Sequence, residues 1–221
     1  MNEKPAPTPT YRLVPSRFPP IGLFDTVSTA SDLAAVMDLV GWTNDRLVAE
    51  RRDRLPREEW VYGRANASIV MASFLHVAPG GMRFNNGDLG AWYAAAALTT
   101  SIAEVAHHMR REAVATAQPG LSRTFRTYTA TLGGSFVDIR GQSKVRPDLY
   151  DPTNYAASQQ FGEELRANGG SGLIYDSIRH DGGTSIVAYR PSRILDVTQT
   201  HHYEITVEAT SPRILAKKLK T

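Results

Sequence analysis

The stretch of sequence that decides the fold reads GGMRFNNGDLGAWYAAAALTTSIAE at residues 80–104. A proline and two glycines at 79–81 interrupt any regular element before it, so the stretch opens on a turn. The apolar segment 91–95 then predicts a strand, and residues 101–115 predict a helix that ends before the next Pro-Gly pair. A turn, a strand and a helix therefore follow one another closely.

Upstream of this stretch the sequence predicts one strand and several helices. Residues 1–10 contain three prolines and predict a disordered or extended lead-in. Residues 11–14 predict a first strand. Capping residues and apolar positions three and four residues apart predict helices at 31–40 and 44–54. The apolar segment 68–76 is compatible with a buried helix or with a strand, and we favour the helix.

Downstream, the chain alternates between strands and one further helix. β-Branched residues on both sides of Gly133-Gly134 predict a hairpin over residues 127–139. Asp151-Pro152 is typical of a helix start, and Asn168-Gly169-Gly170 is typical of the matching stop. Four short strands are expected after it, at residues 173–178, 185–189, 194–197 and 202–209. The lysine-bearing tail from Pro212 predicts a solvated basic end.

These elements, with no internal repeat, predict an α+β protein with one domain over residues 11–221 and a helical insert at about residues 25–75. The chain has 221 residues, of which 42% are hydrophobic, so it can bury a core. Its net charge is +3 and its basic residues are scattered, which argues against nucleic acid binding. It has no cysteine, no start typical of a signal peptide and no run long enough to span a membrane. We therefore expect a soluble, cytoplasmic protein without disulfides.

Several common catalytic motifs are absent. The sequence has no GxxxxGK[ST], GxSxG or HExxH pattern. Glu104 with His107 or His108 has the spacing of two metal ligands on one helix, but a di-iron site needs a second such set, which the sequence lacks. His201 and His202 form another isolated pair. We therefore expect ordinary polar or core histidines and no metal.

Three side chains near the glycine-rich turn have ordinary structural explanations when they are taken singly. Arg83 could be a surface residue of the turn, and Tyr93 could be a core aromatic. Glu104 could pair with Ser101 in a capping box at the start of its helix. Together they indicate more, because a turn carrying arginine, an aromatic strand and a carboxylate in the first turn of a helix can converge on one cleft.

This combination resembles the RES domain family, the bacterial toxins of RES–Xre type II toxin–antitoxin systems. The family's Gly-Arg-Trp-Asn turn is similar to Met82-Arg83-Phe84-Asn85, and its Tyr-Pro-Ser-x-Arg strand is similar to YDSIR at residues 175–179. Two further segments resemble the family in the same order, at residues 155–166 and 182–191. Tyr11-Arg12 resembles the family's opening pair, and the long helical segment after it is typical of a long-form branch.

The resemblance implies an ADP-ribosyltransferase-like fold, a single compact α+β domain with small mixed or antiparallel sheets and surrounding helices. It implies that NAD is the substrate and that the bond between nicotinamide and ribose is cleaved. Glu104 would then hydrogen-bond the ribose hydroxyls and stabilise the cationic sugar. Tyr93 would stack on or orient the nicotinamide, and Ser177 would position the ribose or the nicotinamide amide. Arg83 would hold phosphate oxygens, helped by Arg12.

The acceptor and the partner also follow from the resemblance. The long-form branch is associated with protein modification, and ribose-phosphate pyrophosphokinase is a described target, so transfer of ADP-ribose to a protein is our first hypothesis. Breakdown of NAD by water or phosphate is the second. The family is encoded beside a helix-turn-helix antitoxin of the Xre type that blocks the cleft. Arg83, Arg12 and Arg179 would attract a carboxylate from it, although a structural ion pair explains Arg179 equally well.

A third hypothesis comes from another class of protein. The chain could be a domain that binds a small ligand or a partner without catalysis, in which Glu104 only caps its helix and Arg83 only fixes a turn. Glutamine also serves in a capping box, so Glu104→Gln would leave such a domain intact. The same change would abolish nicotinamide release by an enzyme.

Overall fold

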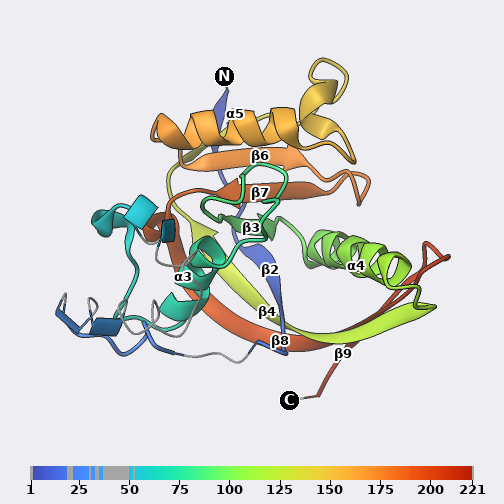
Figure 1. Cartoon of the computed structure of the whole chain (residues 1–221), viewed down its shortest axis with the longest axis horizontal. Coiled ribbons are helices and arrows are strands. Elements are labelled where there is room, and N and C mark those ends of the chain that lie inside the picture. Colours follow the sequence, from blue (N-terminus) through green and yellow to red (C-terminus); the bar gives the residue numbers. More distant parts are fainter. Residues whose placement is uncertain are drawn as a thin grey trace.

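Within the described part of the chain, the structure has nine strands and three fully described α-helices (Figure 1). The computed structural model describes residues 2–18, 22–29, 31–32, 35–36, 50–51 and 53–220. The strands are β1 (Glu3–Pro5), β2 (Thr10–Pro15), β3 (Trp92–Ala95), β4 (Gly120–Leu132), β5 (Ser135–Asp138), β6 (Gly172–Asp176), β7 (Thr184–Ala188), β8 (Ile194–Glu208) and β9 (Ile214–Lys218). The helices are α3 (Ala67–Leu75), α4 (Leu98–Ala115) and α5 (Ala156–Ala167). Short 3-10 helices are present at Arg57–Glu59, Pro147–Tyr150 and Pro191–Arg193.

All nine strands belong to one sheet, in the order β1-β5-β6-β7-β3-β2-β4-β8-β9. Strands β5 and β6 are parallel, and the other neighbouring pairs are antiparallel. This arrangement confirms the α+β class, with the strands joined in one sheet where we expected several small ones. Strands β2 and β3 pair at a single position, Tyr11 with Ala95, so the sheet is least tightly joined there.

The alternation of side chains along each strand sorts them between the two faces of the sheet. In β7, Ile186 packs in the cluster that contains α3 residues, and Val187 packs in the cluster against which α5 packs. Helix α4 packs on Leu13 of β2. The β2–β3 register aligns Leu13 with Tyr93, which packs against the α5 cluster. Helices α4 and α5 therefore cover the same face of the sheet, and α3 covers the opposite face.

Strands β2 and β3 and helix α3 lie where the sequence predicts them, at residues 11–14, 91–95 and 68–76. The predicted helices at 31–40 and 44–54 fall largely outside the described residues, and the insert stays a prediction. None of the described helices combines the length and the apolar character that crossing a membrane requires.

Of the two alternatives for the lead-in, disordered or extended, the structure has the extended one at Glu3–Pro5, where β1 forms. Strand β1 pairs antiparallel with β5, and the Asp138 amide donates to the Asn2 carbonyl oxygen at 2.9 Å. Lys4 forms an ion pair of 3.1 Å with Asp138, and Arg140 binds the same carboxylate at 2.7 Å. A proline on an edge strand leaves no ladder hydrogen bond unmade. Pro5 is therefore compatible with an ordered strand at the edge of the sheet, and Pro7 and Pro9 lie outside that strand.

The hairpin predicted around Gly133-Gly134 is also wrong. Strands β4 and β5 are consecutive in the chain but are not neighbours, since β4 lies between β2 and β8, and β5 lies between β1 and β6. Gly134 has a φ of 94°, and a Cβ there would lie 2.6 Å from Ser171 Oγ. The two glycines therefore let the chain pass from one part of the sheet to another.

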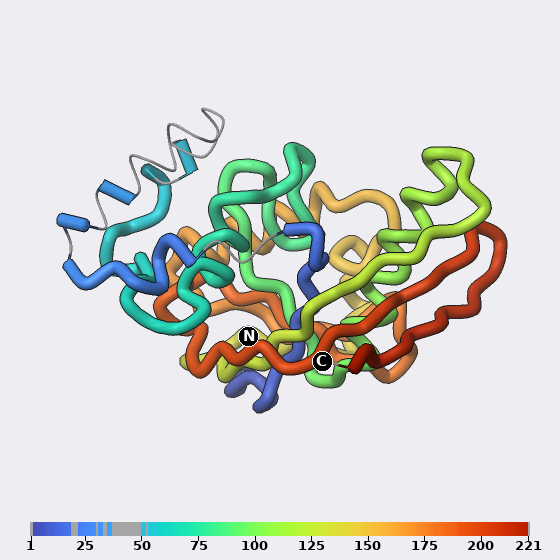
Figure 2. The backbone as a smooth tube through the Cα atoms, turned by 90° about the horizontal axis from the view of Figure 1, so that it is seen from below, coloured from blue at the N-terminus to red at the C-terminus, as the bar shows by residue number. Residues whose placement is uncertain are grey.

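The C-terminal part contains longer strands than predicted. The strands predicted at 194–197 and 202–209 are one strand, β8, which pairs along β4 with two register shifts. The tail that we expected to be a solvated end forms β9 on β8, although its lysines are exposed. Figure 2 shows β4, β8 and β9 running out together, away from the described parts of residues 22–64.

The helix that we predicted to start at Asp151-Pro152 starts later, at Ala156. Asp151 Oδ1 instead accepts hydrogen bonds from the amides of Thr153 and Asn154, at 2.8 and 2.7 Å. Such a side-chain turn satisfies the backbone without a helix, which is why an Asp-Pro pair is an ambiguous start signal.

Candidate active site

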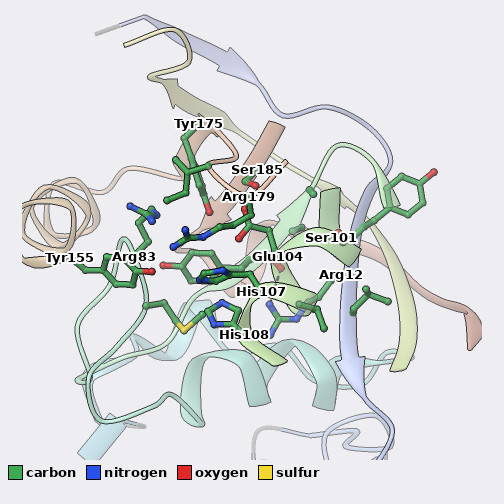
Figure 3. A pocket seen from close by; sticks show the side chains of 18 residues that line it. Arg12, Arg83, Ser101, Glu104, His107, His108, Tyr155, Tyr175, Arg179 and Ser185 are labelled. Carbon is green, nitrogen blue, oxygen red and sulfur yellow. Dashed lines mark hydrogen bonds between the residues drawn. The ribbon is translucent and has the colours of Figure 1, made fainter. Parts of the chain in front are cut away.

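A cavity of about 230 Å³ lies on the face of the sheet that α4 and α5 cover (Figure 3). Its charged, imidazole and tyrosine lining includes Arg12, Arg83, Tyr93, Glu104, His107, His108, Tyr155, Tyr175 and Arg179. Among the described residues that line it, Glu104 is the only carboxylate. The cavity therefore combines one anionic side chain with three guanidinium groups.

Glu104 lies in the second turn of α4. The helix begins at Leu98, one turn earlier than predicted, so the predicted capping box of Ser101 and Glu104 is wrong. Ser101 Oγ instead donates to the Tyr11 carbonyl oxygen at 2.8 Å. The Glu104 carboxylate accepts a hydrogen bond from Ser177 Oγ at 2.6 Å. A residue far away in the sequence therefore holds the carboxylate of α4 at the cavity.

The Ser177 hydroxyl uses all of its hydrogen-bonding capacity within the protein. Its hydroxyl gives its proton to Glu104 and accepts from the amides of Arg179, at 3.2 Å, and His180, at 3.1 Å. Its own amide donates to the Gly183 carbonyl oxygen at 2.8 Å. Ser177 is not among the described residues that line the cavity. The geometry favours a role in holding Glu104 over the direct ligand contact that we expected.

Tyr93 lines the cavity while its hydroxyl is bound to the glycine-rich turn. The hydroxyl donates to Asn85 Oδ1 at 2.8 Å and accepts from the Phe84 amide at 3.0 Å. Burial raises the pKa of Tyr93 far above its usual value, so this hydroxyl stays protonated. Asn85 is fully buried, and its amide donates to the carbonyl oxygens of Asn86 and Leu89. The hydroxyl of Tyr93 thus fixes the turn, and the ring remains as a wall of the cavity.

Arg83 is 8% exposed, and its guanidinium is held on one side only. Nη1 donates to the Asp151 carbonyl oxygen at 2.8 Å, and Cζ lies 4.6 Å from the centre of the Tyr155 ring. No described residue accepts a hydrogen bond from Nε or Nη2. These two atoms form one edge of the planar guanidinium, and such an edge can bind two oxygens of one phosphate group.

Arg12 borders the cavity where β2 and β3 separate. Its Cζ lies 4.8 Å from the centre of the Trp92 ring, and Nη1 donates to the Tyr93 carbonyl oxygen at 2.8 Å. Its Nε is buried and has no partner in the part of the chain that the structure describes. Burial lowers the pKa of Arg12 to about 10, so it remains a cation at neutral pH. A partly buried cation without a counterion is unfavourable, and an anionic ligand would offset that energy.

Two histidines follow Glu104 on α4, and their ring centres are 5.7 Å apart. Burial, and then the charge of Arg179, lowers the pKa of His107 to about 4, so it is uncharged at neutral pH. Burial also lowers the pKa of His108. Within the described ranges, no three or more His, Cys, Asp or Glu side chains are grouped so that they could hold a metal ion.

Three side chains of α5 support the glycine-rich turn, and none of them was predicted from the sequence as a functional residue. Ser158, Gln159 and Glu163 hydrogen-bond the backbone of residues 80–86. In the sequence, residues 155–166 only resembled a segment of the RES domain family, and none of their side chains was assigned a function. One signal was available in Gly162, because a glycine inside a predicted helix often marks a close approach to another part of the chain.

Comparisons with known proteins give a family and similar proteins. A protein-family model described as the RES domain matches residues 51–208. The uncharacterized protein y4oC of Sinorhizobium fredii (strain NBRC 101917 / NGR234) is 25% identical over 213 residues, which cover 93% of this chain and 85% of that protein. A chain in the crystal structure of the M. tuberculosis MbcT-MbcA toxin-antitoxin complex is 16% identical with a TM-score of 0.41, and the match covers 55% of this chain and 73% of that chain. The matched range of the family includes Arg83, Glu104 and Ser177.

Proposed function

Because the chain belongs to the RES domain family, we propose that it is the toxin of a toxin–antitoxin pair and that it cleaves the nicotinamide–ribose bond of NAD. We also propose that it transfers the ADP-ribose to a protein. The observation that supports this most is the placement of Glu104, whose carboxylate lines the cavity and is held by Ser177 at 2.6 Å.

Glu104 supplies a fixed carboxylate, which is the kind of group that cleavage of this bond requires. The electron pair of the broken C–N bond goes to the nicotinamide nitrogen, so nicotinamide leaves as a neutral molecule and needs little acid catalysis. Positive charge remains on the ribose, and a fixed carboxylate stabilises it in the transition state. The hydrogen bond from Ser177 goes to Oε1, and no described residue donates to Oε2. Oε2 is therefore available to the ribose hydroxyls.

The remaining lining residues suit the other parts of NAD. The Tyr93 ring offers a rigid aromatic face against which the nicotinamide ring can stack. The unpaired Nε–Nη2 edge of Arg83 would bind a phosphate of the dinucleotide. Arg12, which lacks an anionic partner in the described chain, would add positive charge nearby. Together these groups would hold the substrate with its ribose beside Glu104.

The acceptor is proposed to be a protein, with ribose-phosphate pyrophosphokinase as the candidate that the long-form resemblance suggests. Water or phosphate would act at the same ribose carbon after nicotinamide has left. These outcomes differ only in the product, so the product analysis below separates them.

A helix-turn-helix antitoxin is the proposed partner. Its carboxylate would enter the cavity and pair with the guanidinium groups of Arg83, Arg12 and Arg179, and so exclude the phosphates of NAD. Co-expression with the neighbouring antitoxin should give a complex that no longer releases nicotinamide. A complex that turns over NAD as fast as the free protein would contradict this part of the proposal.

The test of the proposed activity is release of nicotinamide from NAD by the purified protein. Glu104→Gln should lower the rate by a factor of about 10²–10³, which is typical for the loss of one fixed electrostatic contact in a transition state. The matched control is Glu112→Gln, because Glu112 lies on the same helix but is exposed and pairs with Arg123. It should leave the rate unchanged. A Glu104→Gln protein as active as the wild type would contradict a catalytic role for this carboxylate.

NAD labelled in its adenylate half then identifies the acceptor. Label on a protein band in a cell extract, and on purified ribose-phosphate pyrophosphokinase, is the expected result. Label found only in free ADP-ribose or its phosphate ester would replace transfer by NAD breakdown.

A further inference from the structure

Helix α5 holds the backbone of the turn that carries Arg83. Gln159 Nε2 donates to the carbonyl oxygens of Gly80 and Met82, at 2.9 Å each. Ser158 Oγ, fully buried, donates to the Arg83 carbonyl oxygen at 2.7 Å. These contacts join residues that are far apart in the sequence, so the turn takes its shape from α5 as well as from its own glycines.

Gly162 allows α5 to pack closely against the turn, because it has no Cβ. A Cβ at Gly162 would lie 2.0 Å from the Phe84 carbonyl oxygen and 2.5 Å from the Tyr189 hydroxyl. That hydroxyl itself donates to the Phe84 carbonyl oxygen at 2.8 Å. One helical turn of α5 therefore lies in direct contact with the turn.

The segment that leads into α5 also holds the Arg83 side chain. The Asp151 carbonyl oxygen accepts from Nη1, and the Tyr155 ring lies against the guanidinium. The backbone and the side chain of Arg83 are thus both fixed by residues 151–162. The direction in which the unpaired Nε–Nη2 edge points therefore depends on residues 151–162.

We propose that Gln159 is a positioning residue, which acts through the turn to keep Arg83 in the conformation that binds a phosphate of NAD. This inference rests on the proposed function above. One amide nitrogen with two N–H donors matches two carbonyl acceptors on the same turn. If the amide is removed, both carbonyls lose this partner and the turn is joined to α5 by fewer bonds. The effect should fall on substrate binding more than on chemistry, because Glu104 lies on another helix.

The neighbouring residue offers a matched control. Gln160 is exposed, and its amide donates to Glu164 on the same helix at 2.9 Å. Gln159→Leu and Gln160→Leu therefore make the same substitution at adjacent positions of α5. Only the first one removes hydrogen bonds to the turn. Gln159→Lys keeps a group that can donate to both carbonyls, so it tests rescue.

The first measurement is steady-state kinetics of nicotinamide release. Gln159→Leu should raise KM for NAD about tenfold and change kcat less than about twofold, the pattern of lost ground-state binding. Gln159→Lys should recover most of the affinity, and Gln160→Leu should match the wild type. Equal KM values in both leucine variants would overturn the proposal. An increase in KM that lysine does not reverse would also overturn it.

The second measurement needs no activity. Amide hydrogen exchange of residues 81–86 is measured by mass spectrometry in variants whose melting temperatures match. Exchange should be faster in Gln159→Leu than in Gln160→Leu. Unchanged exchange in Gln159→Leu would overturn the role of α5 even if its KM changed. A wild-type protein that releases no nicotinamide would instead overturn the proposed function, so the two failures are distinguishable.

Discussion

Single residues at the site hold one another before any ligand is bound. Ser177 holds Glu104, and Asn85 holds the hydroxyl of Tyr93. Such bonds fix charged and aromatic groups in one orientation, so less reorganisation is needed when a transition state forms. For the proposed activity, we therefore expect fewer residues to touch the substrate than to affect its turnover.

Ser177→Ala tests this division of roles. The change removes the hydroxyl that donates to Glu104, so we expect kcat for nicotinamide release to fall about 10- to 100-fold, within the range for positioning contacts, with little change in KM for NAD. Ser177→Thr keeps a hydroxyl and should retain most of the rate. Ser143→Ala removes an exposed serine and serves as the control. A large rise in KM with unchanged kcat would instead indicate that Ser177 contacts NAD directly.

The convergence of three candidate residues on one cavity could be predicted from the sequence, but their hydrogen-bond partners could not, and their roles stay predictions. Arg83, Tyr93 and Glu104 line one cavity, as expected from their place in a single stretch. The error at Ser101 and Glu104 has a physical reason. Their spacing fits a capping box, but α4 extends one turn further towards its N-terminus, so Ser101 is free to bind the Tyr11 carbonyl oxygen of β2.

At the level of helices and strands, the close approach of α5 to the glycine-rich turn constrains its sequence at Gly162. Gly162→Ala should be destabilising although alanine favours helices by about 1 kcal/mol. The added Cβ would overlap the Phe84 carbonyl oxygen at 2.0 Å, and relieving such a contact typically costs about 1–3 kcal/mol or more. Urea unfolding should show a lower free energy of unfolding by about 1–2 kcal/mol, and KM for NAD should rise because the turn moves.

Gly80→Ala is the control for this change. It adds a methyl group to the turn itself instead of to α5, at a position where the new Cβ would meet no atom within 4 Å. This variant should be as stable as the wild type. If Gly162→Ala were equally stable, the close approach of α5 to the turn would be contradicted.

Elements formed by local patterns were predictable, and elements defined by distant pairing were not. Residues 68–76 have the apolar character of a buried helix, and α3 is there. The segment 127–139 has the local signature of a hairpin, but its strands pair with β2 and β8 on one side and with β1 and β6 on the other. A strand's period of two shows which side chains are buried together, and it does not show which strand lies next to it.

In the whole molecule, the site exists because α4 and α5 cover the same face of one sheet. Glu104 lies on α4, Tyr93 lies on β3, and Arg83 lies in the turn that α5 holds by a hydrogen bond. All three side chains line the cavity. The sequence predicted the class and the family, which the match over residues 51–208 supports. It could not predict the strand order, on which this convergence depends. The extent of the domain and the insert at 25–75 stay predictions.

The pH dependence of stability is a property of the whole molecule that follows from histidines whose pKa is lowered in the folded state. The pKa of His107 is lowered from 6.5 to about 4, and burial lowers the pKa of His76 and His108 as well. Between pH 6.5 and about 4 the unfolded chain binds a proton at His107 that the folded protein does not bind. The free energy of unfolding should therefore decrease as the pH falls through this window, by up to about 1.4 kcal/mol per pH unit for one such group. Above pH 6.5 this contribution should be constant.

The measurement is urea unfolding of the wild type and of His107→Gln at pH 7, 5.5 and 4.5. Glutamine does not titrate, so the variant should lose less stability than the wild type between pH 7 and 4.5. The comparison stays above the range in which Asp138 takes up a proton, because its hydrogen bonds with Arg140 hold its pKa well below 3.8. Protonation of Asp138 in stronger acid would break the ion pairs of β5 with Lys4 and Arg140 in both proteins alike. Equal losses of stability in the two proteins above pH 4.5 would show that His107 is not held neutral beside the cavity.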